Sequence, residues 1–71
     1  METITITTEF IRLQDAMKLA SLTPSGGAAK CLIQDGQVQV NGSTCLQRGK
    51  KLRPGDTIVF QGRQYQIAYA P

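Results

Sequence analysis

The spacing of the apolar residues changes at Gly36, and this change constrains the fold more than any other feature of the sequence. Upstream of it, apolar residues recur at the spacing of one helix face: Leu13, Ala16, Met17 and Ala20. Downstream, the segment Gln37-Val38-Gln39-Val40 alternates with the period of a half-buried strand. Because 71 residues supply apolar side chains for one small core, the sequence predicts a single α+β domain over residues 1–71.

Two short helices are expected before Gly36, in the N-terminal half of the chain. The first is predicted to run from Leu13 to about Ser21. The second is predicted to begin after Ser25, whose hydroxyl can accept a hydrogen bond from an amide of the first turn. It should end at Asp35-Gly36, where glycine can adopt the left-handed conformation.

The remaining segments are expected to form a small antiparallel sheet against which the two helices pack. Residues 3–7 alternate as a short strand that directs Ile4 and Ile6 inward. Asn41-Gly42 is the pair of residues most typical of a type I′ hairpin turn. Near the C-terminus, strands are expected at residues 57–60 and 63–69, joined by a tight turn at Gln61-Gly62.

Two further expectations concern side chains on these elements. Tyr65, Ile67 and Tyr69 share one face of the last strand, which favours a place in the core over a role in stacking on bases. Cys31 lies in the apolar run of the second helix and is expected to be a small buried residue.

Missing residue types exclude several classes of function. The chain has no histidine and no tryptophan, which removes most zinc sites and all histidine-based catalytic schemes. Its two cysteines can form at most one disulfide and lack a Cys-x-x-Cys pattern. Asp15, Asp35 and Asp56 fall on separate expected elements, so their spacing indicates no catalytic carboxylate pair. We therefore expect a protein that is not an enzyme, with no cofactor, no metal and no small-molecule substrate.

The location of the protein is inferred from its start and its hydropathy. The sequence begins Met-Glu-Thr-Ile-Thr-Ile, without the basic start and apolar run of a signal peptide. No segment is apolar enough over sufficient length to span a membrane. The expectation is a cytoplasmic protein with reduced thiols and no membrane partner.

Basic residues concentrate in the last third of the chain. Residues 48–71 contain five lysines and arginines against one acidic residue, whereas residues 1–47 contain three against four. Four of the five lie in Arg48-Gly49-Lys50-Lys51-Leu52-Arg53. Arginine forks match phosphate oxygens and lysine adds point charge, so this cluster indicates a polyanionic partner.

The start of the second helix is a second candidate site for an anion. Gly26 and Gly27 follow Ser25 at a helix N-terminus, where amides point outward and glycine allows a phosphate to approach closely. Lys30 lies five residues after Ser25 and can share a face with these amides.

Several motifs follow one another in a distinctive order: Arg12-Leu13, Ala29 to Gly36, Val38-x-Val40-Asn41-Gly42, and Gly55-Asp56-x-Ile58. In this order and spacing they resemble the S4-like RNA-binding domain, or αL motif, over about residues 12–60. Ser25-Gly26-Gly27 and the run Arg48 to Asp56 are similar to a subgroup of small free-standing bacterial members, although many members have arginine where this chain has Gly26. The resemblance implies RNA binding, with ribosomal RNA during ribosome assembly as the target, and no catalysis.

The combined interpretation is a protein that binds structured RNA, either ribosomal RNA or a ribosomal particle. Phosphates are expected to lie between residues 48–53, termed the basic loop, and the N-terminus of the second helix. The residues expected to bind RNA are Arg12, Ser25, Gly26, Gly27, Lys30, Arg48, Lys50, Lys51 and Arg53.

Three other readings of the sequence stay open at this point. The basic loop can instead dock on an acidic protein. A DNA-binding protein is less favoured, because no expected helix is rich in the arginine, asparagine and glutamine that read the major groove. A ubiquitin-like sulfur carrier is also disfavoured, since such carriers need a C-terminal Gly-Gly and this sequence ends Ala-Tyr-Ala-Pro.

Overall fold

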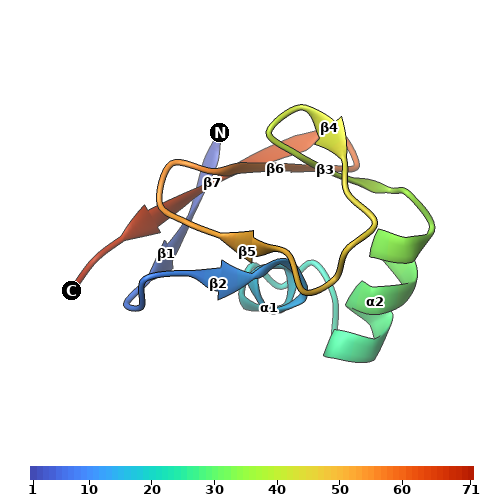
Figure 1. Ribbon diagram of the computed structural model, residues 1–71, viewed down its shortest axis with the longest axis horizontal. Coiled ribbons are helices and arrows are strands. Elements are labelled where there is room, and N and C mark those ends of the chain that lie inside the picture. Colours follow the sequence, from blue (N-terminus) through green and yellow to red (C-terminus); the bar gives the residue numbers. More distant parts are fainter.

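A five-stranded mixed sheet supplies most of the core of the computed structural model, which describes all residues, 1–71 (Figure 1). Its strands follow the order β1-β7-β6-β3-β4. Their bounds are β1 Glu2–Ile6, β3 Val38–Val40, β4 Ser43–Thr44, β6 Thr57–Phe60 and β7 Arg63–Tyr69. As expected, the inward residues of β1 and β3 are buried: Ile4, Ile6, Val38 and Val40.

The prediction of a purely antiparallel sheet is wrong, because β1 pairs with β7 in parallel. The pairs β3–β4 and β6–β7 are joined by two-residue turns, which force antiparallel pairing. The rest of the chain lies between β1 and β7, so no tight turn connects them. These two strands can therefore pair in parallel.

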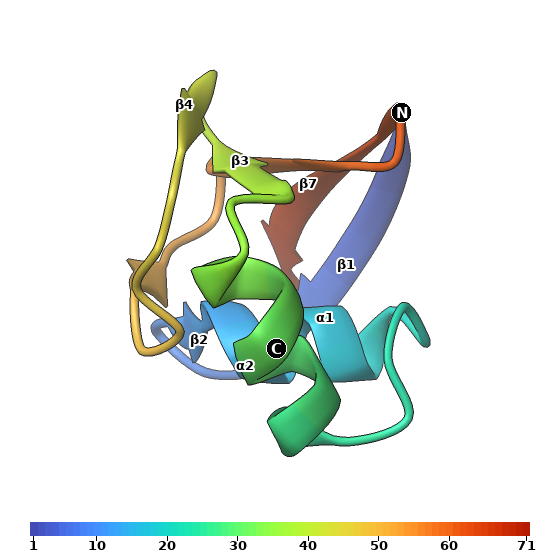
Figure 2. The same cartoon turned by 90° about the vertical axis from the view of Figure 1, so that its right-hand side faces the viewer.

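Both helices lie on one side of this sheet and pack against each other (Figure 2). Helix α1 spans Leu13–Leu19 and helix α2 spans Gly26–Gln34. The strand expected at residues 3–7 is present as β1, and both β1 and β2 (Ile11–Arg12) precede α1, so the helices are not the first elements of the chain. Neither helix is long and apolar enough to cross a membrane.

Local signals set the ends of the helices. Ser25 Oγ accepts a hydrogen bond from the Ala28 amide at 3.2 Å, which confirms the expected cap of α2. Gly36 follows α2 with φ of 80°, as expected of a residue that ends a helix. Helix α1 ends two residues earlier than expected, because Ser21 adopts φ of 60° and leaves the helical conformation.

The two predicted hairpin turns are confirmed by their backbone angles. Asn41 and Gly42 have φ of 51° and 86°, and Gln61 and Gly62 have φ of 53° and 77°. Positive φ at both central residues defines the type I′ turn, whose twist matches that of the strands it joins.

A second, two-stranded sheet went unpredicted. Strand β2 pairs antiparallel with β5 (Lys51–Leu52), which places Ile11 opposite Leu52 and Arg12 opposite Lys51. Two residues per strand are too few to produce a detectable alternation in the sequence. The side chain of Leu52 is fully buried, so this short ribbon is anchored in the core.

Two predicted core residues lie at the surface. Tyr69 is 53% exposed because β6 pairs with β7 only as far as Gln66, so the end of β7 projects beyond it. Cys31 is exposed because α2 buries Ala29 and Ile33, one turn apart, and a residue midway between them faces the opposite side of the helix.

Two glycine substitutions provide a test of the turn geometry. A Cβ at Gly62 or at Gly49 would meet no atom within 4 Å, but only Gly62 has a positive φ. We expect Gly62→Ala to lower the free energy of unfolding by about 1–2 kcal/mol through backbone strain alone. Gly49→Ala should change it by less than about 0.5 kcal/mol. Urea denaturation measures the free energy of unfolding of both variants. Equal losses would contradict the assignment of a positive φ to Gly62 alone.

Candidate nucleic-acid interface

The basic loop, residues 48–53, follows β4, includes β5 and is fixed to the start of α1 through its backbone. The Leu13 amide donates to the Lys50 carbonyl at 2.9 Å, and the Gln14 amide donates to the Arg48 carbonyl at 3.0 Å. No side chain caps α1, so the loop carbonyls satisfy amides that a helix N-terminus leaves without partners. The loop therefore has a defined position, although all of its residues except Leu52 are exposed.

The β2–β5 ribbon extends the positive charge of this loop. Its register places Arg12 directly opposite Lys51, and both residues are exposed. Like charges at directly opposed positions repel each other and destabilise a strand pair. A bound anion between or over the two side chains would relieve this repulsion.

Phe10 lies beneath both of these cations. Lys51 Nζ is 4.9 Å from the centroid of the Phe10 ring, and Arg12 Cζ is 5.9 Å from it. The negative face of an aromatic ring attracts cations at such distances, which offsets part of the repulsion between the two charges. Sequence reasoning missed Phe10, although its spacing of two from Arg12 would place both side chains on one face of a strand.

Arg53 follows β5 in a turn that is held by Asp56. The carboxylate of Asp56 accepts hydrogen bonds from the Arg53 amide at 2.7 Å and from Asn41 Nδ2 at 3.1 Å. Asn41 Oδ1 in turn accepts from the Thr57 amide at 2.9 Å. Asp56 is therefore engaged with the backbone and with Asn41, and the guanidinium of Arg53 carries no ion pair.

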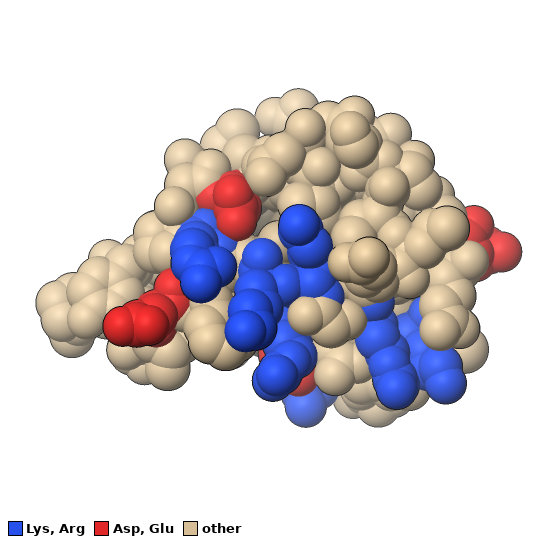
Figure 3. Space-filling view, in the orientation of Figure 1, with Lys and Arg blue, Asp and Glu red and all other residues tan.

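None of the cations of the interface makes an ion pair within the protein. The single ion pair joins Arg63 to Glu2 at 2.6 Å, and the hydrogen bond and charge of Glu2 raise the pKa of Arg63. Arg63 starts β7 and does not belong to the basic loop. Lysine and arginine side chains gather along the lower half of the face shown in Figure 3, the side on which β2, β5 and the helices lie in Figure 1.

The first turn of α2 leaves amides available, as expected. Ser25 accepts from the amides of Ala28 and Ala29, whereas the amides of Gly26 and Gly27 have no partner. Neither glycine has a positive φ, and a Cβ at Gly26 would meet no atom within 4 Å. The fold therefore does not require glycine at position 26. A glycine there would instead allow a ligand to approach the backbone closely.

The structure brings together some of the predicted site residues and not others. Arg12, Arg48, Lys50 and Lys51 are linked by the β2–β5 register and by the two hydrogen bonds to α1. Lys30 is half-buried on α2, one turn after Gly26. No hydrogen bond or ion pair joins α2 at its N-terminus to the basic loop, so a phosphate clamp between them stays a prediction.

Comparisons with known proteins agree with this architecture. The sequence is 41% identical over 59 residues to the "Probable ribosome maturation protein RlbA" of Bacillus subtilis, covering 83% of each chain. It is 35% identical over 57 residues to the "Putative RNA-binding protein YbcJ" of Escherichia coli, covering 80% of this chain and 81% of the relative.

Solved structures show the same fold. The solution structure of YbcJ from E. coli, described as revealing an αL motif involved in RNA binding, matches with a TM-score of 0.72 and 32% identity. That match covers 96% of this chain and 87% of the other. The ribosomal protein S4e of Thermoplasma acidophilum matches in fold with a TM-score of 0.67 and 20% identity, over 90% of this chain and 34% of the other. The sequence model of the S4 domain matches residues 4–68, and the chain belongs to the S4 domain family.

Proposed function

We propose that this protein binds structured RNA, with ribosomal RNA or a ribosomal particle as its target, mainly through phosphate contacts. The observation that carries the proposal is the pairing of Arg12 with Lys51 over Phe10, beside a loop whose cations have no acidic partner. A polyanion is the ligand class that neutralises such a surface.

The relatives support RNA as this polyanion. One relative is named an RNA-binding protein, and its structure is described as containing an αL motif involved in RNA binding. Another is named for ribosome maturation, which supports a ribosomal target and a cytoplasmic location. Folded RNA presents closely spaced phosphates, which proteins recognise largely by shape and charge.

The geometry favours binding over catalysis. The proposed contact residues supply cations and outward amides, which hold phosphates, and Phe10 supplies a ring under two of the cations. This set includes no nucleophile beside a base. Arg12, Arg48, Lys50, Lys51 and Arg53 would contact phosphates on the loop side. Ser25, Gly26, Gly27 and Lys30 would receive a further phosphate at the start of α2.

Charge reversal at one position tests the location of the interface. We expect Lys51→Glu to weaken binding to a ribosomal RNA fragment by about tenfold or more, because a phosphate contact becomes a repulsion. The matched control is Arg63→Glu, which changes the net charge equally but lies on β7 beside Glu2. The affinity of this control variant for RNA should stay within about threefold of the wild-type value.

Filter binding or fluorescence anisotropy at fixed salt measures both affinities, and circular dichroism checks that both variants are folded. Equal losses in the two variants would show that net charge alone attracts RNA. A wild-type protein that binds no RNA at low salt would instead favour docking of the basic loop on an acidic protein.

Phe10 is expected to position Lys51 and Arg12 for RNA. Phe10→Leu keeps an apolar side chain but removes the ring, so RNA affinity should fall by about two- to fivefold. Phe10→Tyr keeps a ring over which both cations can lie, so this variant should bind RNA as tightly as the wild type. Anisotropy titrations measure the RNA affinity of both variants. If Phe10→Tyr lost as much affinity as Phe10→Leu, the ring would be excluded as the cause of the loss.

A further inference from the structure

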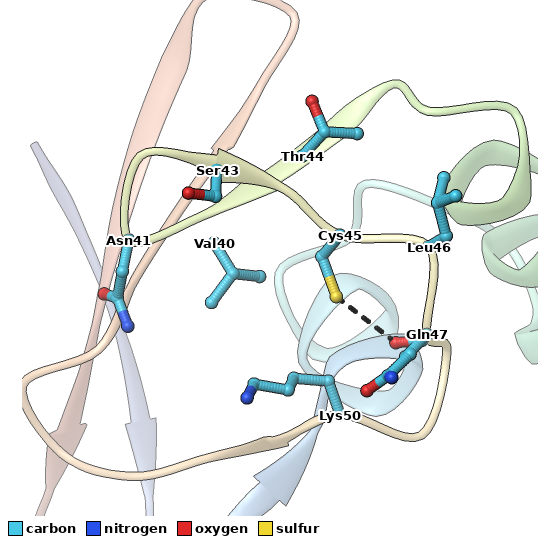
Figure 4. Close-up of a pocket in the computed structure, with 8 residues that line it drawn as sticks. All are labelled: Val40, Asn41, Ser43, Thr44, Cys45, Leu46, Gln47 and Lys50. Atoms are coloured by element: carbon cyan, nitrogen blue, oxygen red, sulfur yellow. Dashed lines mark hydrogen bonds between the residues drawn. The ribbon is translucent and has the colours of Figure 1, made fainter.

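A cavity of about 540 Å³ lies between the β3–β4 hairpin and the basic loop (Figure 4). The proposed phosphate contacts use only one of its lining residues, Lys50. The cavity is lined by Val40, Asn41, Ser43, Thr44, Cys45, Leu46, Gln47 and Lys50. Its volume lies within the range typical of pockets that hold small organic molecules.

The walls combine apolar and polar chemistry. Figure 4 shows Val40 and the Cys45 sulfur directed into the cavity from the hairpin side, with Lys50 extended along the opposite side. The Gln47 carbonyl accepts from Cys45 Sγ at 3.6 Å and from the Lys50 amide at 3.2 Å, which holds the loop around the cavity. No acidic residue lines it, so an anionic group can enter without repulsion.

Several polar side chains around the cavity have no partner within the protein. Ser43 and Gln47 make no side-chain hydrogen bond, and Lys50 makes no ion pair, whereas both ends of the Asn41 amide are engaged. A free glutamine amide both donates and accepts, a hydroxyl does the same, and an ammonium group donates. The site therefore suits a ligand with a flat apolar face, a mixed donor and acceptor edge, and a negative charge.

We propose that this cavity receives the base of an unpaired nucleotide whose phosphate lies against Lys50. An unpaired nucleotide has these three properties, whereas a base within a duplex has its faces stacked and its pairing edge occupied. The inference rests on the proposed RNA-binding function and deepens it. The preferred RNA then carries a bulged or looped-out nucleotide next to the phosphates that the basic loop contacts.

The test compares two RNA hairpins that differ only in one bulged 2-aminopurine nucleotide. Wild-type protein should bind the bulged hairpin about fivefold or more tightly than the fully paired one, and the fluorescence of 2-aminopurine should change on binding. Gln47→Ala should reduce this preference to less than about twofold while affinity for the paired hairpin is kept. Its backbone carbonyl, which orders the loop, is unaffected by the substitution.

Gln64→Ala is the matched control, because Gln64 is an exposed glutamine on β7, outside the cavity. This variant should keep the full preference for the bulged hairpin. Equal affinity of the wild type for both hairpins, with unchanged fluorescence, would overturn the inference and leave the proposed RNA binding intact. Failure to bind either hairpin at low salt would overturn both.

Free nucleotides distinguish the source of the ligand. Adenosine and uridine monophosphates are titrated into ¹⁵N-labelled protein, and amide shifts confined to residues 40–50 would show that the cavity accepts a nucleotide. Such shifts together with a preference for the bulged hairpin support the proposal. Such shifts without that preference would assign the cavity to free nucleotides and overturn its role in RNA recognition.

Discussion

Two hydrogen bonds between the first turn of α1 and the basic loop connect the fold to its charged surface. They join the amides of Leu13 and Gln14 to the carbonyls of Lys50 and Arg48. A helix of seven residues without a side-chain cap needs such partners, because its first amides have none within the helix. The backbone of the loop is thus structural, whereas its side chains stay free for a ligand.

The β2–β5 ribbon places two positive charges next to each other, and a bound anion would reduce their repulsion. The β2–β5 register holds Arg12 and Lys51 side by side over the face of Phe10, and neither cation makes an ion pair. Asp56, the acidic residue nearest to Lys51 in sequence, is engaged with the Arg53 amide and Asn41. Arg12 and Lys51 are therefore positioned by Phe10 before any ligand binds, which lowers the conformational entropy that these two side chains lose on binding.

Local signals in the sequence predicted much of this fold, and long-range pairing accounts for what they missed. The Ser25 cap and the turns at Asn41-Gly42 and Gln61-Gly62 depend on a few adjacent residues, and each is confirmed. The parallel pairing of β1 with β7 depends on residues from the two ends of the chain. The candidate site shows the same division between local signals and long-range pairing. The sequence indicated the cations of residues 48–53, but only the register shows that Arg12 and Phe10 lie beside them.

The salt dependence of RNA binding tests the central claim most directly. Phosphate contacts release counterions, so the logarithm of the association constant should fall linearly with the logarithm of salt concentration. For roughly three to five contacts the slope should lie between about −2 and −4. Measured on a ribosomal RNA fragment with wild-type protein, such a slope would support binding through the cations of the basic loop and the β2–β5 ribbon. Retained binding with a slope near zero would contradict it.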